Sequence, residues 1–334
     1  MRSHEYKFTL RELSQTTGPV LLVLLALMGI LKLMQQCAPL PRPAAALDPN
    51  TMILVHQSRA ARSPGRAELV LVGDSTCLVG IEPPALSRAL SNRIEAINLA
   101  MLSWFDLRDY AELASNFAQA NTGQVRFVVL LVTPEKLGMS RSEEQEEFWR
   151  EIRSDSNTSP RLQNTPVRIS DPLGLRYLRE NLLGQVLAVP LRQRGQGTAY
   201  FGFSSEVDAY MTAHHGGLLD FSTFVRPKSP HEGNWTFAPD LETQSRGFRA
   251  LIPHGAGLFV GFTPVARSFF LPDDSSKRGE ALRRWNQWLQ ADVMLTNLPP
   301  CLPDVLFASK GHLNQAGQAR FTQILSTNLV PLLQ

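Results

Sequence analysis

Apolar runs of strand length alternate with amphipathic stretches of helix length along this chain, and this alternation constrains the fold more than any other feature. The clearest run is VRFVVLLV at 125–132, which only Arg126 interrupts. Such a run is typical of a central strand in a parallel sheet, because helices cover both faces of that strand. ELVLVG at 68–73 and GLFVGF at 257–262 are similar. The pattern therefore predicts an α/β domain.

The other predicted elements follow the same rhythm. Short strands are predicted at 94–100 and 293–298, and helices at 83–92, 106–121, 277–290 and 314–333. Strands that alternate with helices form βαβ units, so we predict a flavodoxin-like parallel sheet with helices on both faces. The segment at about 140–254 is rich in Gly, Pro, Ser and Asn, and it is interpreted as an irregular insertion with one helix at 171–189.

The N-terminal segment predicts a membrane anchor. Residues 18–34 are mostly aliphatic, and the only charged residue among them is Lys32. A lysine near the end of a membrane helix can extend its ammonium to the interface, so the span approaches the ~20 residues that crossing requires. Basic residues precede the span, which favours a cytoplasmic N-terminus at 1–17. The main domain, 51–334, is then expected in the periplasm, on a single-pass anchor in the inner membrane.

A Pro-rich linker at 35–50 separates this anchor from the main domain, and its prolines favour an extended spacer. Cleavage of a signal peptide is the alternative to a retained anchor, because PAAALD at 43–48 contains small residues. The distance from the apolar segment to PAAALD is long and Pro-rich, which favours retention.

Charge and cysteine content narrow the function classes. The net charge is +3, spread along the chain without a dense Lys/Arg run, so the sequence does not indicate nucleic-acid binding. Cys37, Cys77 and Cys301 lie far apart and form no C-x-x-C pair. A zinc knuckle or a thioredoxin-type site is therefore not indicated, and no cofactor is expected.

Ser75 is the first candidate for chemistry. It follows the strand at 68–73 in the sequence GDS. Ligands of open parallel sheets bind at the carboxyl ends of the strands, which is where this serine falls. Its backbone N–H can stabilise an oxyanion there, and Asp74 can hold the loop. A hydroxyl is a weak nucleophile at neutral pH, so Ser75 needs a general base.

His312 is the candidate base. It precedes the last predicted helix, which Asn314 is expected to cap. A loop histidine at that point returns to the edge of the sheet where Ser75 lies. The two residues stand in order at opposite ends of the domain, and this arrangement is more specific than either motif alone.

The pair resembles the SGNH (GDSL-type) hydrolase superfamily. GDS at 73–75 matches its first block, and HLNQAG at 312–317 matches its last block. GDSTCLVGIEP at 73–83, VVLLVTPEKL at 128–137 and the anchored topology resemble one subgroup, the extracytoplasmic proteins that esterify polysaccharides together with membrane-bound O-acyltransferases. The resemblance implies an SGNH-like fold, a Ser75–His312 site, an acyl donor protein in the membrane and a polysaccharide substrate.

Three positions depart from the superfamily pattern. Ser309 stands where an Asp three residues before the histidine is usual. Ser309 itself, a backbone carbonyl or one of several carboxylates could orient His312 instead; these carboxylates are Asp304, Asp273 and Asp274. Ala100 replaces the second-block glycine, with Asn98 as the alternative oxyanion donor. Thr133 begins the segment where the third-block Asn is expected.

The expected activity is acyl transfer, with acetyl as the default group and a cell-surface or secreted polysaccharide as the acceptor. The same residues make a carbohydrate esterase if water is the acceptor. The alternative from another class is a non-catalytic accessory protein of a polysaccharide synthesis or export complex, which the departures favour. The side chains His214, His215, Asp220 and His231 are of types that ligate metals, but no spacing motif supports a metal site.

Overall fold

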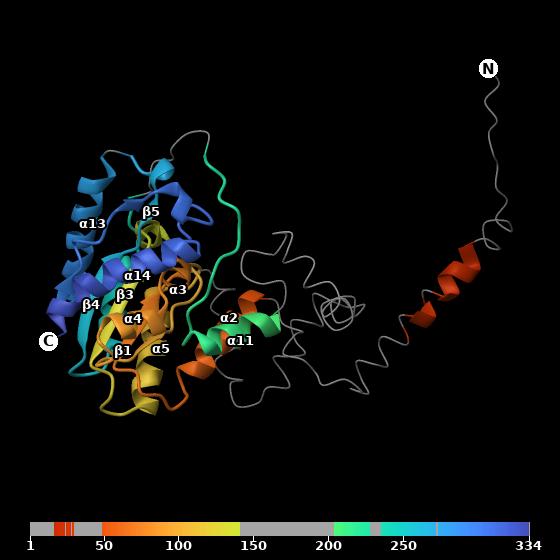
Figure 1. Cartoon of the computed structure of the whole chain (residues 1–334), viewed down its shortest axis with the longest axis horizontal. Coiled ribbons are helices and arrows are strands. Elements are labelled where there is room, and N and C mark those ends of the chain that lie inside the picture. The colour runs from red at the N-terminus through yellow and green to blue at the C-terminus, as the bar shows by residue number, and fades with distance from the viewer. Residues whose placement is uncertain are drawn as a thin grey trace, which may run out of the picture.

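The computed structural model describes residues 17–23, 25–27, 29, 49–140, 204–227, 235–271 and 273–333. Its core is a five-stranded parallel sheet in the order β2-β1-β3-β4-β6 (Figure 1). The strands are β1 (Leu69–Gly73), β2 (Ala96–Asn98), β3 (Phe127–Val132), β4 (Gly257–Phe262) and β6 (Val293–Met294). This order is consistent with the predicted flavodoxin-like sheet, and the apolar runs that predicted β1, β3 and β4 are confirmed as strands.

Helices cover both faces of this sheet, which is why β1 is buried along its whole length. On one side α14 (Gln315–Leu329) packs against α3 (Ser75–Gly80) and α4 (Pro83–Ala89), in front of the sheet in Figure 1. A second set of helices consists of α5 (Leu107–Ala120), α12 (Leu241–Leu251) and α13 (Asp274–Leu289). In that set α12 contacts both α5 and α13.

Two further helices pack together at the β2 edge of the sheet. They are α2 (Pro49–Ala60) and α11 (Ser204–Ala213). The smaller elements are a two-stranded sheet of β5 (Val265–Ala266) and β7 (Cys301–Leu302), and short 3-10 turns η2 (Pro134–Gly138), η4 (Arg267–Phe269), η5 (Asp304–Leu306) and η6 (Val330–Leu332).

The middle of the chain is more regular than the sequence predicted. The expected irregular insertion at about 140–254 includes α12, whose apolar face is buried against the domain core, and α11. The amphipathic pattern of α12 is as strong as that of α5, so this helix could have been predicted from the sequence. The helix predicted at 171–189 lies outside the described residues.

The predicted anchor at 18–34 lies only partly within the described residues. The described parts of 17–29 are helical, and their large apolar side chains are at least half exposed. No helix within the described ranges is long and apolar enough to cross a membrane. The linker at 35–50 lies outside the description except for its last two residues, which begin α2.

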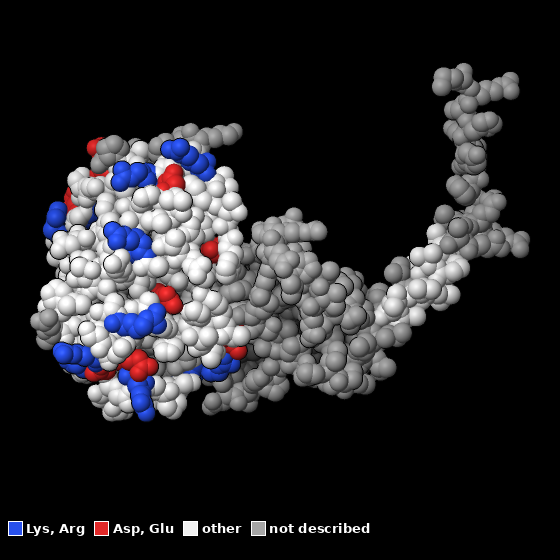
Figure 2. Space-filling view, viewed as in Figure 1, with Lys and Arg blue, Asp and Glu red and all other residues white. Residues whose placement is uncertain are grey.

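Charged side chains are distributed without a one-sign patch on the face seen in Figure 2, where Lys and Arg are interspersed with Asp and Glu. This mixture agrees with the small net charge of the sequence. It gives that face no continuous basic surface of the kind that binds a phosphate backbone.

Candidate active site

Ser75 lies at the carboxyl end of β1, as the first residue of α3. The chain turns here at Gly73, which has a φ of +151°. A Cβ on Gly73 would lie 1.8 Å from the carbonyl oxygen of Leu131 on β3, so only glycine fits this turn. Ser75 is 8% exposed, so it is largely but not completely shielded from solvent.

Asp74 fixes the start of the Ser75 helix. Its Oδ1 accepts hydrogen bonds from the Thr76 N–H at 3.0 Å and the Thr76 hydroxyl at 2.5 Å. Its Oδ2 accepts from the Thr133 N–H at 2.9 Å and the Thr133 hydroxyl at 3.0 Å. The expectation that Asp74 holds this loop is confirmed. Thr133 stands where the superfamily usually has its third-block Asn. Through Asp74 it connects the end of β3 to the turn that carries Ser75.

His312 reaches the same edge from the loop before α14. That loop is held by a bridge between Phe307 and Leu313, and by Asn314, whose side chain accepts from the Gly317 N–H at 3.0 Å. Asn314 is therefore the N-cap that the sequence predicted. The Nε2 atom of His312 lies 2.9 Å from the Ser75 hydroxyl oxygen. The structure thus brings together two residues that are 237 positions apart.

Asp220 is the residue that completes this arrangement, and sequence reasoning missed that role. Its Oδ2 lies 2.7 Å from Nδ1 of His312, on the ring edge opposite Ser75. The Asp220 side chain is 1% exposed and that of His312 is 20% exposed. Because a carboxylate accepts, Nδ1 carries the proton and Nε2 is left to accept from Ser75. Ser75, His312 and Asp220 therefore have the connectivity of a nucleophile, base and orienting acid.

The residues predicted to orient His312 have other partners, so that prediction is wrong. The Ser309 hydroxyl accepts the His312 backbone N–H at 3.3 Å, while Nδ1 of the ring is bound by Asp220. Asp304 accepts from the Ser268 N–H and pairs with Arg226. Asp274 accepts from the Leu271 N–H and the Trp235 indole N–H, and Asp273 is the N-cap of α13 without a capping hydrogen bond from its side chain. The carboxylates of Asp304 and Asp274 therefore support their own turns of the chain.

Asp220 lies on segment 214–227, which we call the strap; it begins with a turn at 214–216 and continues without helix or strand. The Leu218 N–H donates to Leu78 on α3, and Gln318 on α14 donates to the Leu218 carbonyl at 2.8 Å. Gly216, with a φ of +86°, passes so close to Asn98 that a Cβ would lie 1.9 Å from its carbonyl oxygen. The strap is therefore hydrogen-bonded to α3, which begins with Ser75, and to α14, which follows His312. The GGLL sequence before Asp220 was the available sign of such close packing.

The charge of Asp220 is stabilised where it lies. Burial alone would raise the pKa of this carboxyl, but hydrogen bonds from His312 and from Ser222 outweigh that effect and hold its pKa below the usual value. Asp220 is thus ionised at neutral pH and can stabilise a protonated His312.

The predicted oxyanion donors at Asn98 and Ala100 are not available, which corrects that part of the sequence interpretation. The Ala100 N–H donates to the Asn98 side-chain oxygen at 3.0 Å. The Asn98 amide donates to the carbonyls of Cys77 and Leu78 at 3.0 and 3.4 Å. Both residues are fully buried and brace α3 against β2. The Ser75 N–H begins a helix, and no partner for it is found within the described residues.

Within the described residues, the histidines considered as metal ligands have other contacts and do not join Asp220 at a metal site. His214 stacks on Tyr210 with ring centroids 3.9 Å apart, and His215 lines a cleft beside β2. His231 lies outside the described residues. Across the described ranges, no group of three His, Cys, Asp or Glu side chains is placed to hold a metal ion.

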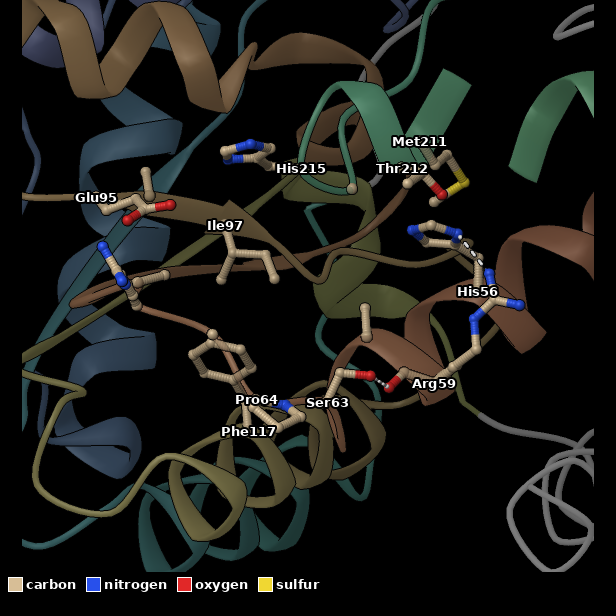
Figure 3. Close-up of a pocket in the computed structure, with 16 residues that line it drawn as sticks. His56, Arg59, Ser63, Pro64, Glu95, Ile97, Phe117, Met211, Thr212 and His215 are labelled. Atoms are coloured by element: carbon tan, nitrogen blue, oxygen red, sulfur yellow. Dashed lines mark hydrogen bonds between the residues drawn. The ribbon is translucent and has the colours of Figure 1, made fainter. Parts of the chain in front are cut away.

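The cleft beside β2 has a volume of about 350 Å³ (Figure 3). Ile97, Phe117 and Pro64 line it, with His56, Arg59 and His215 around them. Asp208 contacts both His56 and Arg59, and Glu95 also lines the cleft. Its charges are therefore largely balanced, and neither Ser75 nor His312 contributes to it.

Comparison of the sequence with protein-family models and with curated proteins gives no match. The class of this protein is therefore stated from its fold and site alone: an α/β protein with a five-stranded parallel sheet and a Ser–His–Asp constellation at the carboxyl edge of that sheet.

Proposed function

We propose that this chain is a serine acyl-transfer enzyme of the SGNH type, which passes an acyl group, by default acetyl, through Ser75 to a polysaccharide hydroxyl. The observation that carries the proposal is the hydrogen-bonded series from Ser75 to His312 to Asp220, with distances of 2.9 and 2.7 Å. This series is the usual device for activating a hydroxyl that is otherwise a weak nucleophile.

In the first half-reaction Ser75 Oγ attacks the carbonyl carbon of the acyl donor while its proton passes to Nε2 of His312. The Ser75 N–H, at the start of α3, stabilises the oxyanion that forms. The intermediate then expels the donor's leaving group, which takes the proton from His312. Asp220 stabilises the imidazolium during both steps but keeps its own charge.

In the second half-reaction His312 removes the proton of an acceptor hydroxyl, which attacks the acyl carbon of the Ser75 ester. The new ester leaves and Ser75 recovers its proton from His312. A sugar hydroxyl as acceptor gives transfer, and water gives hydrolysis, so the same site would serve an esterase. Which outcome dominates depends on how well the site excludes water when the sugar is bound.

The accessory-protein alternative is less well supported, because the departure at Ser309 does not leave His312 without a carboxylate. We further propose that residues 18–34 anchor the domain at the inner membrane, with the site in the periplasm. There a membrane-bound O-acyltransferase-type partner would deliver the acyl group. The helical, exposed apolar residues near 20–27 support the anchor.

The proposal is tested by mass. The full-length chain in detergent would be incubated with 4-nitrophenyl acetate, and its intact mass compared with that of Ser75→Ala. A single acetyl adduct that maps to Ser75 and is absent from Ser75→Ala is expected. Added oligosaccharides that speed loss of the adduct and become acetylated would establish transfer. A correctly folded wild-type protein that stays unmodified would overturn the proposal and favour the accessory-protein alternative.

A further inference from the structure

Lys136 on η2 is a buried cation near the nucleophile that the mechanism above does not use. It is 3% exposed, and its ammonium donates to the Ser103 carbonyl at 2.9 Å. No ion pair of Lys136 is found within the described residues. A buried ammonium held by a carbonyl alone is costly, since a buried charge ordinarily needs an opposite one. The sequence reasoning gave this lysine no role.

Lys136 is buried, and several carboxylates lie at longer range from its ammonium. Burial lowers the pKa of its ammonium from the ordinary value, and the surrounding carboxylates oppose that shift. Those carboxylates are Asp74, Asp106, Asp109 and Asp240. The Tyr110 ring also faces the ammonium, with its centroid 6.0 Å away. The charge is therefore held in a fixed place between the nucleophile turn and α5.

Tyr110 holds the neighbouring peptide of the same loop. Its hydroxyl donates to the Leu102 carbonyl at 3.0 Å, and its ring is fully buried. Two consecutive carbonyls, those of Leu102 and Ser103, are thus each fixed by a buried side chain. This loop follows β2, and its Met101 N–H donates to Gly73, two residues before Ser75.

The direction of these carbonyls sets the direction of the following N–H groups. Every peptide bond in the described parts of the chain is trans, so each N–H points opposite to the carbonyl of its own peptide. The Ser103 and Trp104 N–H groups therefore point away from Tyr110 and Lys136. Both residues are partly exposed, and no hydrogen-bond partner for either N–H is found within the described ranges.

We propose that Lys136 is a positioning residue, which fixes and polarises the Leu102–Trp104 loop so that the Trp104 N–H, in the same peptide as the Ser103 carbonyl, supplies the second oxyanion contact beside Ser75. A carbonyl that accepts from an ammonium makes its peptide a stronger donor, because linked hydrogen bonds polarise one another. The loop would take the place that Ala100 and Asn98 cannot fill, since their donors are engaged elsewhere. This inference rests on the proposed acyl transfer.

The test measures acylation of the full-length chain by 4-nitrophenyl acetate, with the rate constant at saturation separated from the apparent dissociation constant. The variants are Lys136→Met and Tyr110→Phe. The control is Ser245→Ala, which removes a buried hydrogen bond to Trp285 in the α12–α13 pair. The burst amplitude gives the fraction of active molecules, so a partly unfolded sample is not mistaken for a slower acylation step.

Lys136→Met is expected to lower the acylation rate constant about 10- to 100-fold, with the dissociation constant changed less than about twofold. Tyr110→Phe should give a smaller loss of the same kind, and Ser245→Ala should leave the rate constant unchanged. A rate constant within about twofold of wild type in Lys136→Met, or a loss matched by Ser245→Ala, would overturn the inference.

If Lys136→Met does not fold, Tyr110→Phe decides by the same criterion. Failure of the proposed function is a separate result, because it appears as absence of any acetyl adduct on wild-type Ser75. In that case the inference about Lys136 falls with it. A wild-type adduct with an unaffected Lys136→Met rate constant removes only the inference.

Discussion

Two His–Asp pairs of nearly equal length lie within the described part of the chain, and of these two only one contacts a serine. His312 and Asp220 are 2.7 Å apart, and His56 and Asp208 are 2.8 Å apart. In both pairs Nδ1 contacts the carboxylate. The surroundings differ: Nε2 of His312 contacts Ser75, while Asp208 is shared with Arg59. The second pair joins α2 to α11 and lies beside the cleft of Figure 3.

The comparison teaches that a His–Asp contact does not by itself define chemistry. An arginine beside the carboxylate neutralises it, so Asp208 has less charge to stabilise an imidazolium on His56. Asp220 has no such competitor among the described residues, and it also accepts a hydrogen bond from the Ser222 N–H at 2.8 Å. We therefore propose catalysis for the pair at the carboxyl edge and a structural role for the pair between α2 and α11.

The largest expected difference between the pairs appears when each histidine is removed. His312→Ala should lower acylation by 4-nitrophenyl acetate at least about 10⁴-fold, because Ser75 then lacks a base. His56→Ala should leave the rate within about twofold per active molecule while lowering stability. Stopped-flow acylation with burst titration measures both. Equal losses in the two variants would contradict the assignment.

A smaller difference is expected between two glycines that share a positive φ. Gly216 has a φ of +86° and Gly255 a φ of +85°, but only Gly216 is crowded, by Asn98. Gly255→Ala should cost about 1 kcal/mol of unfolding free energy, from backbone strain alone. Gly216→Ala should cost more and slow acylation, because it displaces the strap that carries Asp220. Urea unfolding and acylation rates give the comparison.

That prediction also tests whether the strap acts through its seat on α3 and α14. Gly216→Ala with wild-type acylation and normal stability would mean that the strap tolerates displacement. The position of Asp220 would then not depend on the close packing at Asn98.

The smallest difference is expected in the pH dependence of stability, where the two pairs should behave alike. A hydrogen bond from His56 lowers the pKa of Asp208, and those from His312 and Ser222 lower the pKa of Asp220 against burial. A depressed carboxyl pKa stabilises the fold above the unfolded value of ~3.9, and this contribution is lost as pH falls through the folded pKa.

Within that window each group should contribute a slope of up to about 1.4 kcal/mol per pH unit. Asp208→Asn and Asp220→Asn should each flatten the acid side of the unfolding curve, as measured by urea titration from pH 5 to pH 2.5. An unchanged slope in either variant would show that its carboxyl has the same pKa folded and unfolded.

Much of the fold could be predicted because its signals are local. The uninterrupted apolar run of β3 and the capping residues Asp106 and Asn314 mark elements by neighbouring residues alone. The motifs GDS and HLN are also local, so Ser75 and His312 could be predicted as site residues from their neighbours in sequence. Asp220 could not be assigned, since its role depends on a strap whose path is set by contacts with Leu78 and Gln318, far away in sequence.

The oxyanion donors show the same limit. The resemblance to the second block indicated Ala100 or Asn98, but whether a donor is available depends on what already accepts from it. Asn98 braces α3 through the Cys77 carbonyl, and it also accepts the Ala100 N–H. A hydrogen bond between a side chain and a distant backbone group leaves no periodic trace in a sequence.

The most direct test of the central claim compares Asp220→Asn with Asp208→Asn in the acylation of the full-length chain. An Asn at 220 can donate to Nδ1, which places the proton on Nε2 and prevents it from accepting from Ser75. We predict a loss of about 10⁴-fold in Asp220→Asn and a rate within about twofold of wild type in Asp208→Asn. Comparable rates in the two variants, both folded, would contradict the claim that Asp220 completes the site.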